Sequence, residues 1–163
     1  MRVTLDIRHD LCPRGTSDQS DQSDLSEVCG GAGLRTLARH VCGGEGLETD
    51  VEISLVLCDD AFIRSLNRRY RRRDRATDVL SFGQSAPDAC GPAVLGDIVI
   101  SLETVAQRCG GDSGKAREEV RTLFCHGLLH LLGYDHVRTR ERGEMTAKQA
   151  EYLARPRQRV IKS

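Results

Sequence analysis

The sequence predicts an α+β fold in which a single small mixed β-sheet packs against helices. Short segments of alternating apolar and polar residues, typical of strands, are interleaved with longer segments whose apolar residues recur every three or four positions. Residues 123–132 are almost entirely apolar, which is typical of a largely buried helix beside the sheet. At 163 residues the chain is long enough to bury its own core, and we expect one domain over residues 1–163.

Each element has its own signal in the sequence. Alternation, or a short apolar run, predicts strands over residues 3–7, 51–57, 79–82 and 95–101. Helical spacing of apolar residues predicts helices over residues 34–41, 102–109, 115–132 and 140–153, and one more that begins at residue 59 or 60. Gly43 and Gly44 end the first of these helices. The carboxylate of Asp59 or Asp60 caps the helix that follows the 51–57 strand.

Two segments carry no signal for a helix or a strand. Residues 17–24 form a short polar repeat with nothing to bury, so we expect a mobile loop over residues 11–24. The acidic residues of this repeat could bind a cation, but a solvated linker fits the composition better. The basic segment at the other end predicts a flexible tail over residues 156–163.

The composition disfavours several classes of protein. The formal net charge is zero, so any contact with RNA must come from a local patch rather than from a uniformly basic surface. Aromatic residues make up 4% of the chain, without tryptophan, which argues against a wide base-stacking platform. No stretch approaches the roughly 20 apolar residues that span a membrane, and the N-terminal residues alternate like a strand, so we expect a cytoplasmic protein with no membrane partner. The seven scattered cysteines, odd in number, predict free thiols.

Three of the five histidines fall within residues 126–136, at the spacing H-x3-H-x5-H. His126 and His130 are four residues apart, so they present their rings on one face of the predicted helix. Gly133 supplies the left-handed residue that commonly ends a helix, and the chain can then turn back to bring His136 to the same point. Three imidazoles around an open fourth position are typical of a catalytic zinc site. The sequence therefore predicts one Zn²⁺ per chain, held by His126, His130 and His136.

A histidine beside an apolar stripe is more often a hydrogen-bonded core residue than a metal ligand. Two unsatisfied imidazoles in an apolar helix would cost on the order of 1–3 kcal/mol each, however, and one metal ion would satisfy both. The histidine and glycine spacing matches that of the metzincin metalloproteases, H-E-x-x-H-x-x-G-x-x-H, but Gly127 stands at the position of their catalytic glutamate. Peptide hydrolysis by the usual route is therefore disfavoured, and we expect the metal to act as a Lewis acid and a source of hydroxide.

Three blocks of the sequence resemble a known family. Residues 126–136, HGLLHLLGYDH, are similar to the zinc signature of the YbeY endoribonucleases, also described as ribosomal RNA maturation factors. Residues 66–71 followed by 77–82 resemble the second block of that family, and residues 95–101 resemble its third. The similarity covers residues 51–136. Ala76 and Gly83 stand where prolines commonly flank the second block, and neither is an expected ligand.

A run of basic residues lies within the second block and just before it. Residues 64–75 hold seven arginines against one acidic residue, Asp74; the arginines are Arg64, Arg68, Arg69, Arg71, Arg72, Arg73 and Arg75. Such a run is more often a solvated helix face than a binding site, but the planar fork of arginine suits phosphate contacts. From the residues alone, a solvated face and a phosphate-binding surface both stay open. The resemblance singles out Arg71 as the residue implicated in activity, so we expect Arg71 to be catalytic.

Other candidates lie near these motifs. Asp97 and Asp135 could act as general bases or orient a histidine, or they could be a strand-edge residue and a turn residue respectively. Tyr70 either stacks on a base or packs against the sheet. Cys125 points roughly 100° away from His126 around the helix, so we do not expect it to bind the metal.

The resemblance implies a zinc-dependent endoribonuclease that acts on single-stranded RNA. It implies ribosomal RNA as the substrate and the small ribosomal subunit, or its assembly factors, as partners. It further implies a role in maturation of the 3′ end of 16S ribosomal RNA and in late ribosome quality control. Two other functions fit part of the sequence: a metalloprotease-like hydrolase explains the histidine spacing but not Gly127, and a non-catalytic ribosome-assembly factor with structural zinc explains the arginines.

Overall fold

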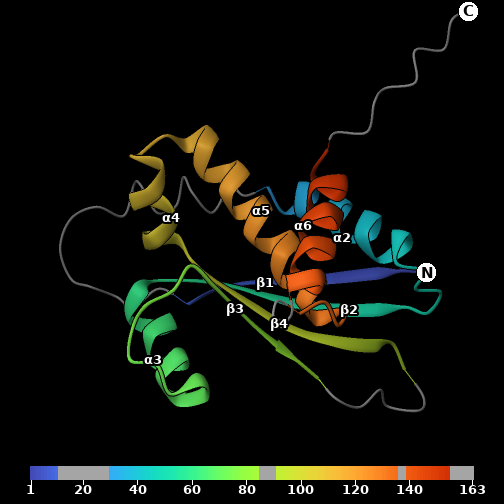
Figure 1. The fold of residues 1–163 in the computed structure, drawn as a ribbon, viewed down its shortest axis with the longest axis horizontal. Coiled ribbons are helices and arrows are strands. Elements are labelled where there is room, and N and C mark those ends of the chain that lie inside the picture. The colour runs from blue at the N-terminus through green and yellow to red at the C-terminus, as the bar shows by residue number, and fades with distance from the viewer. Residues whose placement is uncertain (11–29, 85–90, 136–138, 155–163) are drawn as a thin grey trace, which may run out of the picture.

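The computed structural model describes residues 1–10, 30–84, 91–135 and 139–154. These residues form four strands and five helices, as Figure 1 shows: β1 (Val3–Asp10), α2 (Gly31–Gly44), β2 (Val51–Cys58), α3 (Asp60–Arg71), β3 (Val79–Gly83), β4 (Ala93–Ser101), α4 (Leu102–Cys109), α5 (Ser113–Leu131) and α6 (Thr139–Leu153). The expected loop over residues 11–24 and the expected tail over residues 156–163 fall outside this part of the chain, and so does His136.

The four strands form one mixed sheet in the order β1-β2-β4-β3. Strands β1, β2 and β4 run parallel, and β3 pairs antiparallel with β4 at the edge of the sheet. This confirms the predicted α+β class with a single mixed sheet. The register shifts between Glu52 and Ile53, opposite the point where Gly96 adopts φ +138. A side chain at Gly96 would collide with the carbonyl oxygen of Phe82, so this glycine allows β3 to lie close against β4.

The helices cover the two faces of the sheet unequally. Helices α2, α5 and α6 lie on one face, and α3 lies on the other, where it packs against β3 and β4 (Figure 1). The larger apolar core fills the space between the sheet and α2, α5 and α6, and it is centred on fully buried residues such as Leu55, Phe124 and Leu128. A smaller cluster of Cys58, Ile63, Leu80 and Val99 seals α3 to the opposite face. Strand β3 therefore lies between two helices, α3 and α5.

Helix α5 matches the predicted buried helix closely. Asp112 caps its first turn by accepting a hydrogen bond from the backbone N–H of Lys115, at 2.9 Å. The chain leaves the helix through Gly133, which adopts φ +99, as the sequence predicts. A Cβ atom at Gly127 would lie 2.9 Å from Cγ2 of Ile98 in β4. The helix therefore crosses the sheet at a distance that leaves no room for a side chain at this position.

The main differences from the predicted elements lie at their ends. Strand β1 continues through residues 8–10, although these residues are exposed. Its backbone pairs with β2 along its whole length, from Val3 opposite Val51 to Asp10 opposite Cys58. Hydrophobic alternation ends earlier and so predicts a shorter strand. Helix α2 begins at Gly31, before its first buried residue, and Gly43 and Gly44 form its last turn. Of the two candidate caps of α3, the residue that fills this role is Asp59, whose Oδ1 accepts from the N–H of Phe62 at 2.8 Å.

No helix in the described part of the chain has the length and apolar character needed to cross a membrane. Cys42, Cys58, Cys109 and Cys125 are free thiols. Burial raises the pKa of Cys125 to about 11, and its side chain lies in the core beside the sheet. A thiol in this environment stays protonated at neutral pH, and the expectation that Cys125 is not a metal ligand stays a prediction.

Candidate metal and RNA-binding site

The histidine pair occupies the last two turns of α5. The Nε2 atoms of His126 and His130 face each other at 3.2 Å, and the ring planes are inclined by 76°. Two ligands of a tetrahedral zinc ion at a Zn–N distance of 2.0–2.1 Å are about 3.3 Å apart. The two imidazoles therefore have the separation that a shared zinc ion requires. His136, the third expected ligand, lies outside the residues that the structure describes.

The opposite nitrogen of His126 also has a partner. Its Nδ1 lies 3.0 Å from Oε1 of Gln149 in α6. Because an amide oxygen only accepts, this contact favours the His126 tautomer with the hydrogen on Nδ1 and the lone pair on Nε2. This is the tautomer in which Nε2 is able to bind a metal. The two described donors thus fit a zinc ion at this point, although the described residues form no group of three that could hold a metal by themselves.

A cavity of about 560 Å³ opens beside the two histidines. One wall is formed by β3 and the preceding Asp78, and the other by the end of α5 and the turn that follows it, through Asp135. Arg71 closes the rim from α3. The structure therefore gathers the expected catalytic arginine and two of the three expected ligands around one cavity, although they are more than 50 positions apart in the sequence.

Arg71 is the last residue of α3 and is held at the edge of the sheet. Its Nη2 donates to the carbonyl oxygen of Ser81 at 3.3 Å, on the free side of β3. The chain beyond it is fixed by the buried side chain of Asn67, whose Nδ2 donates to the carbonyl of Arg75 at 2.9 Å. Arg72 ends the helix in the left-handed region, with φ 56. Arg71 is an exposed residue at the cavity rim, where an anion can reach it.

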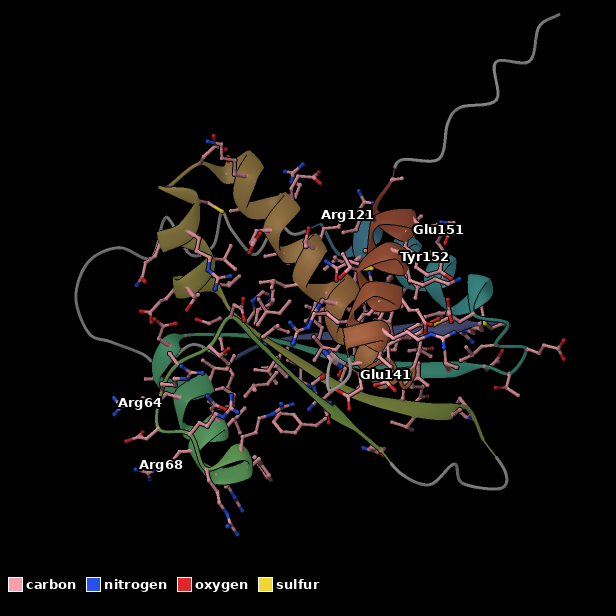
Figure 2. All side chains as sticks on the ribbon, viewed as in Figure 1. Arg64, Arg68, Arg121, Glu141, Glu151 and Tyr152 are labelled. Carbon is pink, nitrogen blue, oxygen red and sulfur yellow. The ribbon has the colours of Figure 1, made fainter. Side chains whose placement is uncertain are left out.

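The other arginines occupy different positions on α3. Arg64 makes two hydrogen bonds to Asp74, at 2.9 and 3.2 Å, and these raise the pKa of Arg64. Figure 2 shows Arg64 and Arg68 on the outer side of α3, pointing away from the sheet. Tyr70 lies edge-on to Phe82 of β3 with ring centroids 5.2 Å apart, yet 57% of it is exposed. Packing against the sheet, one of the two roles expected for Tyr70, is therefore observed.

Asp78 is the acidic residue in the strand-side wall of the cavity. Its Oδ2 lies 2.6 Å from Nη1 of Arg108, which also contacts Glu119 in α5 at 3.3 Å. Burial by itself would raise the pKa of Asp78, but the hydrogen bond and charge of Arg108 outweigh burial and lower it. Asp78 is thus a carboxylate committed to an ion pair, which disfavours a role as a proton acceptor.

The two carboxylates considered from the sequence separate in the structure. Asp135 lines the cavity, two residues beyond Gly133. Asp97 lies in β4 between Ser54 of β2 and Phe82 of β3 and is not among the cavity-lining residues described. Of the two candidates, only Asp135 is placed where it could take part in the chemistry of this cavity.

A second polar network holds the turn after α5. Glu45, at the end of α2, accepts hydrogen bonds from the hydroxyls of Tyr134 at 2.7 Å and Tyr152 at 2.5 Å. Lys148 lies 3.4 Å from the same carboxylate. Burial alone would raise the pKa of Glu45, but the two hydroxyls and the ammonium group outweigh it and lower the pKa. Because Tyr134 lines the cavity, Glu45 ties the cavity wall to both α2 and α6.

The sequence of this chain matches one known protein family. Residues 17–157 match the family model described as Endoribonuclease YbeY. The chain belongs to the YbeY family. An Endoribonuclease YbeY of Paramagnetospirillum magneticum is 37% identical over 160 residues, which are 94% of this chain and 93% of that protein. The solution structure of TM1509 from Thermotoga maritima superposes with a TM-score of 0.54 at 25% identity and covers 92% of this chain and 87% of that one.

Other YbeY relatives are longer than this chain. An Endoribonuclease YbeY of Anaeromyxobacter dehalogenans is 50% identical over 106 residues, which are 65% of this chain but 54% of that protein. The chain thus spans about half the length of the first curated relatives that it matches. The comparisons thus show the family and the fold of this chain.

Sequence reasoning missed three polar residues of the site. Asp78 lies within the second block, but nothing in its neighbourhood reveals its pairing with Arg108, 30 residues away. Gln149 and Glu45 carry no local signal, because each reaches the site from another helix. One signal was available: the predicted helix over residues 140–153 follows the histidine turn directly, so one of its polar side chains could face the histidines.

Proposed function

We propose that this protein is a zinc-dependent endoribonuclease that cleaves single-stranded RNA. The observation that carries the proposal is the cavity where Arg71 meets the paired Nε2 atoms of His126 and His130. Membership of a family whose relatives are named endoribonucleases supports the reaction class. His136 would complete the ligand set at the next turn of the chain.

The residues around the cavity have distinct parts in such a reaction. Zinc held by His126, His130 and His136 would supply Lewis-acid activation of the phosphodiester or of a water molecule. Arg71 binds the scissile phosphate and stabilises the negative charge that builds up on it. Its hydrogen bond to Ser81 fixes the guanidinium at the rim, so little reorganisation is needed when the phosphate arrives. Arg72 and Arg73, which directly follow α3, attract the flanking backbone phosphates.

The substrate we propose is ribosomal RNA, in the cytoplasm. The role implied by the family is maturation of the 3′ end of 16S ribosomal RNA, together with late quality control of ribosomes, with the small subunit or its assembly factors as partners. Residues 64–75 carry six net positive charges in a chain whose formal net charge is zero, which supports contact with RNA at one local patch. A membrane partner has no part in this proposal.

Two alternatives make different predictions. A metalloprotease of the metzincin type uses a glutamate at the position of Gly127, and here a Cβ atom at that position would already lie 2.9 Å from Cγ2 of Ile98. A non-catalytic ribosome-assembly factor would use zinc only as a structural ion. The open cavity beside the histidines favours a catalytic site over a closed structural one.

Metal analysis and an RNA cleavage assay test the proposal together. The purified protein should hold about one zinc per chain. It should cut a labelled single-stranded RNA, leave the matching duplex largely intact, and lose activity with a chelator until zinc is restored. Digestion of casein instead would support the protease. Intact RNA despite full zinc content and binding to small subunits would support the assembly factor, and either result would overturn the proposal.

A further inference from the structure

The C-terminal helix contributes directly to the histidine site. Gln149 of α6 is 23 residues from His126, and its amide oxygen lies 3.0 Å from Nδ1 of that ring. Its side chain is half-buried, between solvent and the end of α5. The Nε2 atom of the same ring lies 3.2 Å from Nε2 of His130. Gln149 thus contacts the histidine on the side opposite its partner ring.

The position of Gln149 is set by the packing of α6. Met145 and Tyr152, four residues before and three residues after it, are 1% and 3% exposed. Residues at these spacings share one face of a helix, so Gln149 lies on the buried face of α6. The hydroxyl of Tyr152 donates a hydrogen bond to Glu45, which directly follows α2, and this bond holds α6 against α2. The amide is therefore held by contacts that do not involve the histidines.

The consequence for His126 follows from the chemistry of imidazole. A neutral ring carries one hydrogen, on either Nδ1 or Nε2, and only the bare nitrogen can bind a metal. An acceptor at Nδ1 favours the hydrogen at that atom. The lone pair of Nε2 then points toward Nε2 of His130, where a zinc ion would be shared. Without the acceptor, this preference for the hydrogen on Nδ1 would be lost.

We propose that Gln149 is a positioning residue of the metal site, which fixes the tautomer and the orientation of His126. The inference rests on the proposed zinc function for its biological meaning, but the tautomer itself is a property of the metal-free protein. Partners of this kind on ligating histidines typically account for 10- to 100-fold in metal affinity. Helix α6 would then be a part of the metal centre rather than only a cover of the core.

Three variants separate this role from simple packing. Gln149→Met keeps the volume and removes the acceptor, whereas Gln149→Glu keeps an acceptor oxygen. Ala147→Met places the same methionine at an exposed position of α6 and serves as the matched control. Gln149→Ala, which is too short to reach the ring, is a second variant without the acceptor. Zinc dissociation constants are measured by chelator competition, and the tautomer of His126 is read from ¹H–¹⁵N spectra of the metal-free proteins at pH 8.

We expect Gln149→Met and Gln149→Ala to bind zinc about 10- to 100-fold more weakly and to lose the Nδ1–H signature of His126. Gln149→Glu should retain both properties, and Ala147→Met should behave as wild type. Unchanged affinity and an unchanged tautomer in a folded Gln149→Met protein would overturn the inference. Wild-type protein that binds no zinc would instead contradict the proposed function, while the spectra of the metal-free protein would still decide the role of Gln149.

Discussion

At the scale of single residues, the site depends on pairs that the fold brings within bonding distance. His126 and His130 are paired by one helical turn, and that pairing follows from their spacing alone. Arg71 joins them only because α3 ends at the free edge of β3 and the arginine reaches Ser81. The histidine pair is thus local in the sequence, whereas the approach of Arg71 to the histidines depends on the fold. Substitution of a histidine tests metal content, and substitution of Arg71 tests the rate of cleavage.

Replacing His130 with alanine should remove most of the zinc, because two remaining ligands hold the ion poorly. The control is His9→Ala, which removes an exposed histidine at the end of β1. Elemental analysis after dialysis gives the zinc content of both variants. Zinc content of the wild-type protein should also fall below about pH 6, because protonated imidazole cannot bind a metal. Full occupancy in His130→Ala, or retention of zinc at pH 5, would rule out histidine ligation.

Arg71→Ala should lower the rate of RNA cleavage by about 100- to 1,000-fold while zinc content and folding stay unchanged, because it removes a contact to the charge that develops on the phosphate. Arg73→Ala, two positions further along the same run, should weaken RNA binding modestly and reduce the dependence on salt by about one phosphate contact. Single-turnover cleavage at saturating protein distinguishes the two effects. Equal rates for both variants would mean that the cluster is only an electrostatic groove.

At the scale of elements, the depth of the cavity depends on how closely α5 approaches the sheet. Gly127 permits that approach, since a Cβ atom there would lie 2.9 Å from Cγ2 of Ile98. The branched side chain of Ile98 is fully buried and cannot move aside easily. The same glycine replaces the glutamate of the metalloprotease motif. Gly127 thus has two effects: it leaves this position without a general base, and it lets α5 pack closely against β4.

Gly127→Ala should lower the free energy of unfolding by about 1–3 kcal/mol through overpacking against Ile98. Ile98→Ala alone should cost about 2–5 kcal/mol, because it leaves a cavity. The double variant should cost clearly less than the sum, since the new methyl group enters the space vacated by the isoleucine. Gly143→Ala, where no atom lies within 4 Å of the added Cβ, should instead be neutral or stabilising. Additive losses in chemical denaturation would disprove this contact.

The elements were largely predictable, and the relations between them less so. Helix α5 and its end at Gly133 follow from apolar spacing and one glycine. The last three residues of β1 do not, because they are exposed and belong to the sheet only through backbone pairing with β2. Arg71 was singled out by family resemblance, not by its charge, which six neighbours share. Gln149 could not be predicted, because its role depends on how α6 packs over the histidines.

At the scale of the whole molecule, Glu45 connects three parts of the chain. Its carboxylate binds Tyr134 of the cavity wall and Tyr152 and Lys148 of α6, and Glu45 itself follows α2. Its side chain is 15% exposed, so these bonds are only partly screened by water. The hydrogen bond to Glu45, together with burial, raises the pKa of Tyr134 to about 12, which keeps the phenol protonated at any physiological pH.

Glu45→Gln should lower the free energy of unfolding by about 1–3 kcal/mol at pH 7, because a neutral amide replaces a charged acceptor of two hydroxyls and an ammonium group. The folded-state pKa of Glu45 is lowered, so its stabilisation is present above the ordinary value near 4.3 and is lost as the pH falls through the folded-state value. The difference between wild type and variant should therefore shrink below about pH 4. Glu48→Gln, at an exposed position, is the control. A difference as large at pH 3 as at pH 7 in urea titrations would contradict this account.

The left-handed backbone conformation of Arg72 lowers stability at a position whose side chain we expect to bind RNA. At φ 56, a residue other than glycine lowers the free energy of unfolding by about 1–2 kcal/mol. Glycine avoids this strain but loses about 0.5–1 kcal/mol more through chain entropy on folding, so glycine is the more stable residue at this position. Arg72→Gly should therefore raise the melting temperature slightly and weaken RNA binding at the same time. Arg73→Gly, which removes the same charge from a residue without a positive φ, should weaken binding with no gain in stability. The trade-off would identify position 72 as one where selection for binding has kept a less stable backbone.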